Sequence, residues 1–381
     1  MIFVQTLAQK QIIIAVTGSI AAVEVIRLIH ALRRRGATVQ PVMSAAAMGI
    51  IHPDALTYAS GRETIVRLGG RVEHVLYCGD GGSADLLLIA PCTANTLAKI
   101  ACGIDDTPVT TFATTAIGSK KPVLIVPAMH HSMYRHPALG GNIARLERWG
   151  VEFAGPRIEE GKAKIADIDE IVLRCERAVM GRPLRGQQVL ITSGPCREPV
   201  DDVRVLTTRS GGQMGRELAL QAFRLGAEVT VVHRDTFPCV TNVPADTAQE
   251  MHDAVLHCCA SRGPDIYISA AAISDFAPKR VKGKIPSGGV VSIGLEPLPK
   301  LLTEVVQRYA PKTVAFKLGR KQEKKAAAMI AGGGIEMVLV NEPGTMGSEH
   351  GEYVCLTQKG RTAVSGTKEE IAAAVWNKLI P

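Results

Sequence analysis

Residues 11–22, Gln-Ile-Ile-Ile-Ala-Val-Thr-Gly-Ser-Ile-Ala-Ala, pass from a short apolar run through one glycine directly into an amphipathic segment. An unbroken apolar run such as Ile12–Val16 is typical of a strand buried on both faces. The spacing of apolar residues then predicts a helix over Ile20–Arg35, ended by Gly36. Small residues at this turn would let backbone N–H groups meet an anion at the helix N-terminus. A tight strand-to-helix turn without a ligand would have the same local sequence.

The same alternation continues through the first half of the chain. Further short apolar runs lie at Val39–Val42, Asp85–Ala90 and Val123–Val126, and a helical segment at Ala94–Ala101 ends near Gly103. Buried strands that alternate with helices predict a parallel sheet covered on both faces. We therefore expect an α/β domain of the flavodoxin-like or Rossmann-like type.

The pattern restarts after the polar, turn-rich segment 181–186. A new strand is predicted at Gln187–Thr192, and the following elements complete a second Rossmann-like α/β domain. We place the domains at residues 1–183 and 184–381. The later predicted elements are strands at Val229–Val232, Ile266–Ala270, Val314–Phe316 and Met337–Val340, an antiparallel pair at Tyr353–Thr357 and Thr362–Ser365, and a final helix at Lys368–Leu379.

Composition narrows the class of protein. The 381 residues include no apolar run of ~18 residues, and residues 1–10 lack a basic segment followed by an apolar one, so we expect neither a membrane span nor a secretion signal. The nine cysteines form no CxxC pair, which indicates reduced thiols in the cytoplasm rather than a zinc ribbon. A net charge of +8 with only 4% aromatic residues favours phosphorylated small molecules over nucleic acid, although a solvated basic surface would also account for it.

The glycine loops bear on the type of nucleotide. The turn at residues 17–22 has a single glycine, and the second predicted strand closes at Met43-Ser44 without an acidic residue. A dinucleotide fold typically has three glycines and an acidic residue at that place. A mononucleotide phosphate such as that of FMN therefore fits better than NAD. In the second half, Ser210-Gly211-Gly212 precedes a predicted helix at Arg216–Leu225 and could seat a nucleotide phosphate.

Longer motifs follow the predicted strand ends. The segments PCTANT (91–96) and PAMHHSMY (127–134) resemble the PASANT-like and PxMNxxMW-like motifs of FMN-dependent cysteine decarboxylases. The second half resembles phosphopantothenate–cysteine ligases in ITSGPCREPVDDVR, RSGGQMG, GAEVTVV, SAAAISDF and GKIPS. Together, in this order, the two halves resemble the bifunctional coenzyme A biosynthesis proteins. The segments EEGKAKIAD and PAMH are more similar to those of the archaeal members than to those of the bacterial members.

This resemblance implies two successive reactions. The ligase half would join 4′-phosphopantothenate to cysteine through an acyl-nucleotide, using CTP with Mg²⁺, with ATP as the alternative nucleotide. The decarboxylase half would then convert 4′-phosphopantothenoylcysteine to 4′-phosphopantetheine with FMN, which supplies the redox chemistry. The family also implies a homo-oligomer that combines trimers and dimers, and we expect twelve subunits.

For the decarboxylase, the resemblance implies that His74 transfers protons, whereas the residues alone would also fit a polar histidine at a strand edge. Asn95 is implied to face the flavin, and asparagine there could also cap a helix. His130 stands where many relatives grip the substrate carboxylate with asparagine, and imidazole can donate to a carboxylate too. The implied FMN contacts are Gly18, Ser19, Ile20, Ala21, Ser44, Pro91, Thr93, Ala94, Asn95, Thr96 and Met129.

The chain departs from the relatives at the segment that closes over the substrate. Bacterial members carry a proton-donating cysteine in the segment that corresponds to Glu159–Asp167, and this chain has none there. We interpret Cys175, in a helical segment nearby, as structural. Lys162 or Lys164 could hold the substrate's phosphate or carboxylate, or both could be solvated, and Met133 is implied to contact flavin or substrate.

For the ligase, the resemblance implies Lys284 as the catalytic lysine and Asp275 as an acid of the nucleotide site. Thr208 replaces an asparagine of the relatives, and Lys279–Lys284 is either a lid or a solvated loop. The other implied contacts are Gly194, Arg204, Ser210, Gly211, Gly212, Ala271, Ala272 and Phe316. Two alternatives remain: a flavin-binding regulator without turnover, favoured by the missing cysteine and by His130, and an NAD(P)-dependent reductase, disfavoured by the missing dinucleotide fingerprint.

Overall fold

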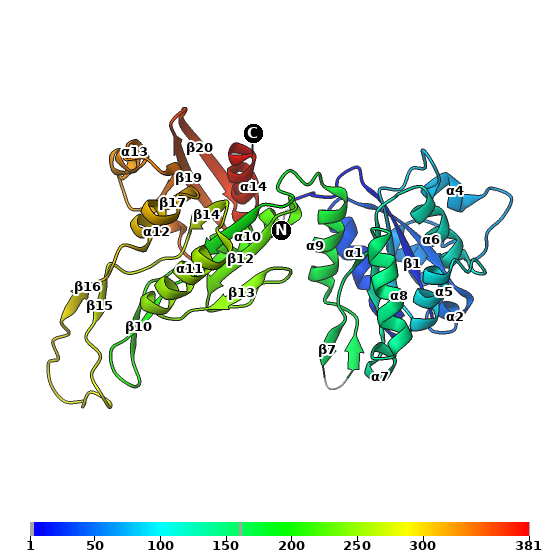
Figure 1. Ribbon diagram of the computed structural model, residues 1–381, viewed down its shortest axis with the longest axis horizontal. Coiled ribbons are helices and arrows are strands. Elements are labelled where there is room, and N and C mark those ends of the chain that lie inside the picture. The colour runs from blue at the N-terminus through cyan, green and yellow to red at the C-terminus, as the bar shows by residue number, and fades with distance from the viewer. Residues whose placement is uncertain (1–3, 160–161, 381) are drawn as a thin grey trace. The chain divides into compact units, whose positions relative to one another are not determined.

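A computed structural model describes residues 4–159 and 162–380, with the side chains of 158–164 outside the description. The chain divides into two compact units, Met1–Gly181 and Arg182–Pro381 (Figure 1). None of the helices in the described residues is both long and apolar enough to cross a bilayer.

The N-terminal unit is built on a parallel five-stranded sheet in the order β2-β1-β3-β4-β6. The apolar runs of the sequence form its central strands, and the Ile12–Val16 side chains are fully buried because helices cover both faces. The strands are β1 (Gln11–Val16), β2 (Thr38–Met43), β3 (Leu86–Cys92), β4 (Val123–Pro127) and β6 (Glu152–Phe153).

Two layers of helices enclose this sheet (Figure 1). One face carries α1 (Val25–Arg34), α3 (Pro53–Ser60) and α9 (Ile168–Val179). The other carries α4 (Glu73–Cys78), α5 (Ala94–Cys102), α6 (Pro108–Gly118) and α8 (Pro137–Arg148). Short elements complete the unit: η1 (Ile20–Glu24), α2 (Ala45–Met48), α7 (His131–Tyr134), and a small sheet of β5 (Met129–His130), β8 (Lys162–Lys164) and β7 (Arg157–Glu159).

The helix predicted over Ile20–Arg35 is two elements rather than one. Its first turn is the 3₁₀ helix η1, in which the Ala22 N–H donates to the Ser19 carbonyl at 2.8 Å, an i to i+3 bond. The Ser19 hydroxyl caps this turn by accepting from the Ala21 N–H at 3.4 Å. The cap therefore tightens the start of the helix, and regular α-helix begins only at Val25.

The C-terminal unit has an eight-stranded sheet in the order β13-β12-β9-β14-β17-β18-β19-β20. The first six strands in this order run parallel to one another, and β19 and β20 add the antiparallel edge that the sequence predicts. The strands are β9 (Gln188–Thr192), β12 (Glu228–His233), β13 (Thr241–Pro244), β14 (Ile266–Ser269), β17 (Lys312–Leu318), β18 (Ile335–Asn341), β19 (His350–Thr357) and β20 (Gly360–Thr367).

Helices α11 (Ala248–Arg262), α12 (Leu301–Tyr309) and α13 (Glu323–Ala331) cover one face of the larger sheet. Helix α10 (Gln213–Arg224) packs against its strands and against α14 (Lys368–Leu379), and the Trp376 indole N–H donates to the Leu218 carbonyl at 2.9 Å. Two small ribbons, β10 (Arg197–Pro199) with β11 (Val205–Thr207) and β15 (Phe276–Pro278) with β16 (Leu295–Pro297), leave the body of this unit, and η2 (Pro343–Thr345) follows β18.

Candidate active sites

The strand order of the N-terminal unit creates a crevice between the carboxyl ends of β1 and β3. The chain leaves β1 toward β2 on one side, while β3 lies on the other, which is the arrangement at which open α/β sheets bind ligands. Thr17, directly after β1, joins the two strand ends. Its hydroxyl donates to the Pro91 carbonyl at 2.7 Å and accepts from the Thr93 N–H at 3.0 Å. The quoted motifs thus meet at one edge of the sheet.

Gly18 allows this turn to pack against α2. A Cβ at position 18 would lie 2.6 Å from the Ala46 Cβ, so glycine is required by the close approach and not by an unusual backbone angle. The N–H groups of Gly18 and Ile20 have no hydrogen-bond partner among the described residues. Ser44, at the end of β2, caps α2 by accepting from the Ala47 N–H at 3.3 Å. The turn therefore offers free backbone donors of the kind that bind a phosphate.

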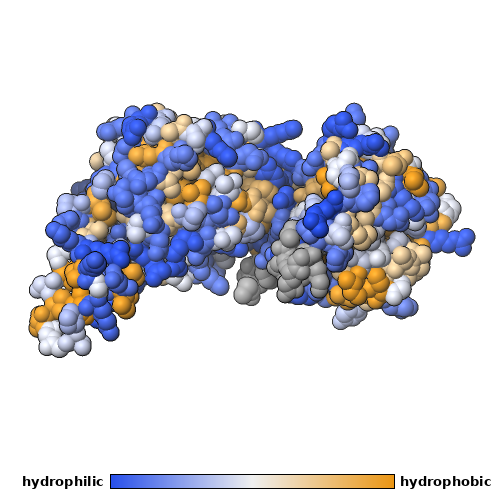
Figure 2. All heavy atoms as spheres, turned by 60° about the horizontal axis from the view of Figure 1, so that its bottom comes forward, coloured by the Kyte–Doolittle hydropathy of each residue, from blue (hydrophilic) through white to orange (hydrophobic). Residues whose placement is uncertain are grey.

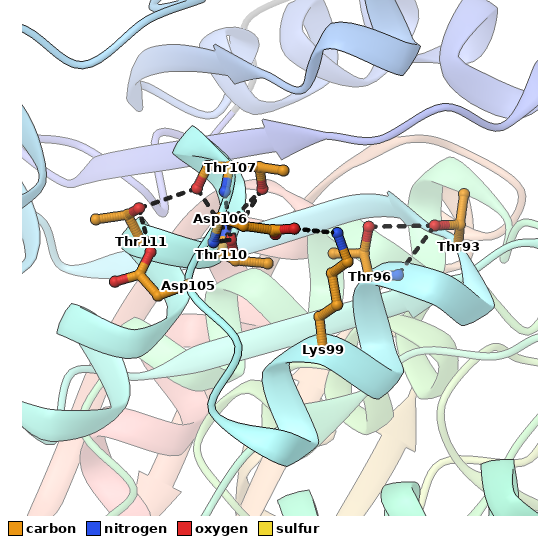
Figure 3. Close-up of polar contacts among 8 residues, drawn as sticks. All are labelled: Thr93, Thr96, Lys99, Asp105, Asp106, Thr107, Thr110 and Thr111. Atoms are coloured by element: carbon orange, nitrogen blue, oxygen red, sulfur yellow. Dashed lines mark hydrogen bonds and ion pairs between the residues drawn. The ribbon is translucent and has the colours of Figure 1, made fainter.

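Helix α5 begins at the β3 end of this crevice, and its cap differs from one sequence expectation. Thr93 is the N-cap, and its hydroxyl accepts from the Thr96 N–H at 3.3 Å (Figure 3). Asn95 therefore does not cap the helix, because it lies in the first turn beyond the cap. Its side chain is exposed and has no partner within the described chain, which leaves its amide available to a ligand.

The loop 103–106 is fastened to the same helix. The Lys99 ammonium lies 2.6 Å from Asp106, and Asp105 accepts from the Thr111 hydroxyl (Figure 3). Thr107 starts α6 with a capping box. These contacts order the loop without occupying the crevice.

A cavity of about 930 Å³ lies beside the phosphate-binding turn. It brings together Ser19, Ile20 and Ala21 with Met129 and His130, which are more than 100 positions away in the sequence. The rest of the lining includes Ile165 and Asp167, from the segment 159–167 that the sequence singled out, and residues that no motif marks, which sequence reasoning missed: Glu24, Arg27, Arg157, Ile168 and Asp169.

His130 has a defined orientation at this cavity. It caps α7, and its Nδ1 accepts from the Ser132 N–H at 3.4 Å while the Ser132 hydroxyl lies 2.9 Å from the same nitrogen. Because Nδ1 accepts, the neutral ring carries its proton on Nε2. Met133, one turn along α7, is half exposed and does not line the cavity.

His74 lies on helix α4, so a position at a strand edge is excluded. Its Nδ1 is buried and has no hydrogen-bond partner among the described residues, an arrangement that costs free energy unless a ligand or another group satisfies it. His74 does not line the cavity that holds His130. The structure therefore does not bring the two histidines into one pocket of this chain.

The cysteines near the site are inert by burial. Cys92 and Cys175 are fully buried, and burial raises the pKa of both thiols far above the usual range. The side chains of Lys162 and Lys164 lie outside the described part of the structure, so the expectation that they hold the substrate is not addressed by it.

In the C-terminal unit the strand order reverses between β9 and β14, which is the place at which open α/β sheets bind ligands. The Ala271 N–H donates to the Thr192 hydroxyl at 3.3 Å, and the Ala272 N–H donates to the Gly194 carbonyl at 2.9 Å. These two N–H groups are thus used within the protein, so the expected contacts of Ala271 and Ala272 with a ligand must come from other atoms.

The loop before α10 closes on the same strand end. Gly212 caps α10 at a φ of 69°, and a Cβ there would lie 3.2 Å from the Gly194 Cα. Ser210 accepts from the Gly212 N–H at 3.4 Å, and Gly211 has open space around its α-carbon. The Thr208 hydroxyl is buried without a partner in the described residues, as expected of a group that faces a ligand.

The remaining predicted ligase residues lie in several separate elements. Asp275 is exposed and pairs with Lys300 at 2.5 Å, and the Phe316 ring meets the edge of Tyr353 at 6.2 Å. Arg204 binds Asp201 at 2.6 Å and the Ile285 carbonyl at 3.3 Å. Lys284 is exposed, and its ammonium has no partner in the ranges that the structure covers. Within these ranges no group of three or more metal-ligating side chains gathers.

Comparisons with known proteins divide the chain near the same place as its two compact units. Residues 4–180 match the flavoprotein family, and residues 184–381 match the family described as DNA/pantothenate metabolism flavoprotein C-terminal domain. Among solved structures, the C-terminal domain of a coenzyme A biosynthesis bifunctional protein CoaBC is 27% identical, with a TM-score of 0.43 over 52% of this chain and 96% of that one. The FMN-dependent cysteine decarboxylase SpaF is 31% identical, with a TM-score of 0.40 over 46% of this chain and 99% of that one.

Several relatives match this chain across both domains, which the single-domain structures above do not. The coenzyme A biosynthesis bifunctional protein CoaBC of Thermococcus kodakarensis is 40% identical over 98% of this chain and 95% of that protein. The CoaBC protein of Methanocaldococcus jannaschii is 33% identical over 98% and 94%, and that of Escherichia coli is 32% identical over 82% and 80%. The fold, the order of the two domains and these relatives show that the chain belongs to the family of bifunctional enzymes of coenzyme A biosynthesis.

Proposed function

We propose that this chain carries out two successive steps of coenzyme A biosynthesis. The C-terminal domain, 184–381, would ligate 4′-phosphopantothenate to cysteine at the expense of CTP, with Mg²⁺ arriving on the triphosphate. The N-terminal domain, 1–183, would decarboxylate the product, 4′-phosphopantothenoylcysteine, to 4′-phosphopantetheine with FMN. The observation that carries this proposal is the pair of switch points in the strand order, each with motif residues of one activity at the neighbouring strand ends.

The N-terminal crevice fits the phosphate and ring of FMN. The free N–H groups of Gly18 and Ile20 would hold the phosphate, and the exposed amide of Asn95 would face the ring system. When bound, the flavin supplies the redox chemistry, taking an electron pair from the substrate's thiol side and returning it after carbon dioxide leaves. The protein's own residues supply orientation and protons.

His130 is the proton donor that we propose in place of the missing cysteine. Ser132 lies at its Nδ1, so Nε2 is the ring nitrogen left for a ligand at the cavity, and the imidazolium form would carry the proton to be donated. After loss of carbon dioxide, the product carries an enethiol, and to give the saturated thiol one carbon of its double bond must accept a proton and the other a hydride. His130 would donate that proton and recover it from solvent. Cys175 is a poor candidate for this role, because its side chain is fully buried.

In the ligase half, Lys284 would offset negative charge as the carboxylate of 4′-phosphopantothenate attacks the nucleotide's α-phosphate and pyrophosphate leaves. Cysteine's amine would then displace CMP from the acyl-nucleotide and form the amide. The buried hydroxyl of Thr208 and the loop Ser210–Gly212 border the place where the nucleotide would sit.

The two activities are separable by single substitutions. We expect Lys284→Ala to abolish amide formation while the variant still decarboxylates supplied 4′-phosphopantothenoylcysteine. His74→Ala should do the reverse. Mass spectrometry of products from phosphopantothenate, cysteine, CTP and Mg²⁺ measures both, with ATP in place of CTP as the test of nucleotide choice. Loss of both activities in either folded variant would contradict two separate sites, and flavin binding without any carbon dioxide release would support a regulator instead.

An assembly is part of the proposal. The segment from Phe276 to Leu295 carries exposed apolar side chains, which appear as orange spheres along the arm at the lower left of Figure 2. They are Phe276, Val281, Val290, Val291, Ile293 and Leu295, each about half exposed or more. Such a surface is typical of an interface. We expect a homo-oligomer of twelve subunits, and light scattering that finds a monomer under active conditions would contradict it.

A further inference from the structure

Two loop segments of the C-terminal unit follow neighbouring strands of the sheet and pair with each other. The ribbon β10–β11 follows β9, and the basic loop 279–285 follows β15, beyond β14. The Val281 N–H donates to the Val200 carbonyl at 2.9 Å, and the Asp202 N–H donates to the Gly283 carbonyl at 3.1 Å. The basic loop is thus paired with the turn 200–204, and the two segments lie in the chain after β9 and β14, the neighbouring strands between which the strand order reverses.

Two adjacent carboxylates strengthen this pairing. Asp201 accepts from the Ile285 N–H at 3.0 Å, and Asp202 accepts from the Gly283 N–H at 2.9 Å. Gly283 and Ile285 are the two residues that flank Lys284. The backbone on each side of the lysine is therefore held by one carboxylate.

The charges of these residues agree with a role of the two carboxylates in holding the basic loop. The loop has four cations within six positions, and Asp202 pairs with one of them, Arg280, at 2.9 Å. The hydrogen bond from Ile285 is the largest cause that lowers the pKa of Asp201, to about 2, and the bond from Arg280 likewise lowers the pKa of Asp202. Both groups are anionic at neutral pH. Lys284 is exposed, and its ammonium, like those of Lys279 and Lys282, has no ion-pair partner within the described chain.

We propose that Asp201 and Asp202 are positioning residues that hold Lys284 at the nucleotide crevice, an inference that rests on the proposed ligase function. They fix the main chain at the flanking residues and leave the ammonium unpaired, so that it meets an anionic nucleotide without first breaking an ion pair. A solvated basic loop would need neither carboxylate in this arrangement.

Asp202→Asn tests the proposal with little change of shape, because among the described residues the Asp202 side chain bonds only to the basic loop. In the full-length protein, limited trypsin digestion should cut after Arg280, Lys282 or Lys284 at least about tenfold faster, the factor expected from weakening one charge-assisted hydrogen bond. The kcat of amide formation should fall by about the same factor. Decarboxylation of supplied intermediate should stay unchanged, and so should the melting temperature.

Asp253→Asn is the matched control, since Asp253 is an exposed carboxylate on α11 that contacts Gln249 and His252. Arg280→Gln should reproduce part of the effect, and the double variant should be less than additive. Wild-type cleavage and kcat in Asp202→Asn would overturn the proposal, as would equal losses in Asp253→Asn. If the wild type forms no amide, the proposed ligase function fails, and the positioning role of Asp201 and Asp202 fails with it. Trypsin digestion still measures whether the carboxylates hold the basic loop.

Discussion

Replacing Gly18 with alanine tests the packing that places the phosphate-binding turn. The new Cβ would lie 2.6 Å from the Ala46 Cβ and 3.1 and 3.2 Å from the Ala46 carbonyl carbon and oxygen. Carbon atoms pack best at ~3.5–4.0 Å, so the turn and α2 must separate by about 1 Å. Overpacking of this kind costs roughly 1–3 kcal/mol, which lowers the Tm of the N-terminal unit by roughly 2–10 °C.

The same displacement moves the N–H groups of Gly18 and Ile20 away from a bound phosphate. We expect FMN to bind at least about tenfold more weakly, a loss of ~1.4 kcal/mol, measured by quenching of flavin fluorescence on titration with apoprotein. Gly141→Ala is the control, because Gly141 lies in α8 with open space at its Cβ position. It should leave FMN binding unchanged and raise the Tm slightly. Wild-type FMN affinity and Tm in Gly18→Ala would refute the close approach to α2.

Three further predictions use other buried contacts. Gly215→Ala would place a Cβ 2.3 Å from the Ser193 hydroxyl, so amide formation should be lost while supplied 4′-phosphopantothenoylcysteine is still decarboxylated; retained ligation would contradict this. Cys175→Ser should decarboxylate at a near-normal rate by mass spectrometry, and accumulation of the enethiol would show that this thiol is the donor. Trp376→Phe removes the 2.9 Å bond to the Leu218 carbonyl and should lower the free energy of unfolding by about 1–2 kcal/mol in urea denaturation, with an unchanged midpoint as the contrary result.

The sequence predicted the elements whose signal is local. The run Ile12–Val16 lies within β1, the Gln187–Thr192 prediction is one residue longer than β9, and the last helix begins and ends as predicted at Lys368 and Leu379. The short ribbons were missed, because three-residue strands such as β10 and β15 have no periodicity to detect.

The residue that caps a helix also could not be predicted from the sequence. Asparagine and threonine both cap helices well, and PCTANT contains two threonines and one asparagine. The hydrogen bonds of Thr17, which fasten Thr93 to the end of β1, place the cap at Thr93 and free Asn95. The choice thus depends on a residue 76 positions away in sequence.

The two α/β domains and the small-residue turns after their first strands could be predicted from the amino-acid sequence, since both follow from apolar runs, glycine and the spacing of neighbours in the chain. The tertiary structure was needed to show that β3 lies beside β1 and β14 beside β9, which brings separate loops to one edge of each sheet. It was also needed to show that Asp201 and Asp202 hold the residues on either side of Lys284. The physical reason is that strand pairing and backbone hydrogen bonds join groups more than 70 positions apart, and local patterns carry no information about which partner a backbone group will find.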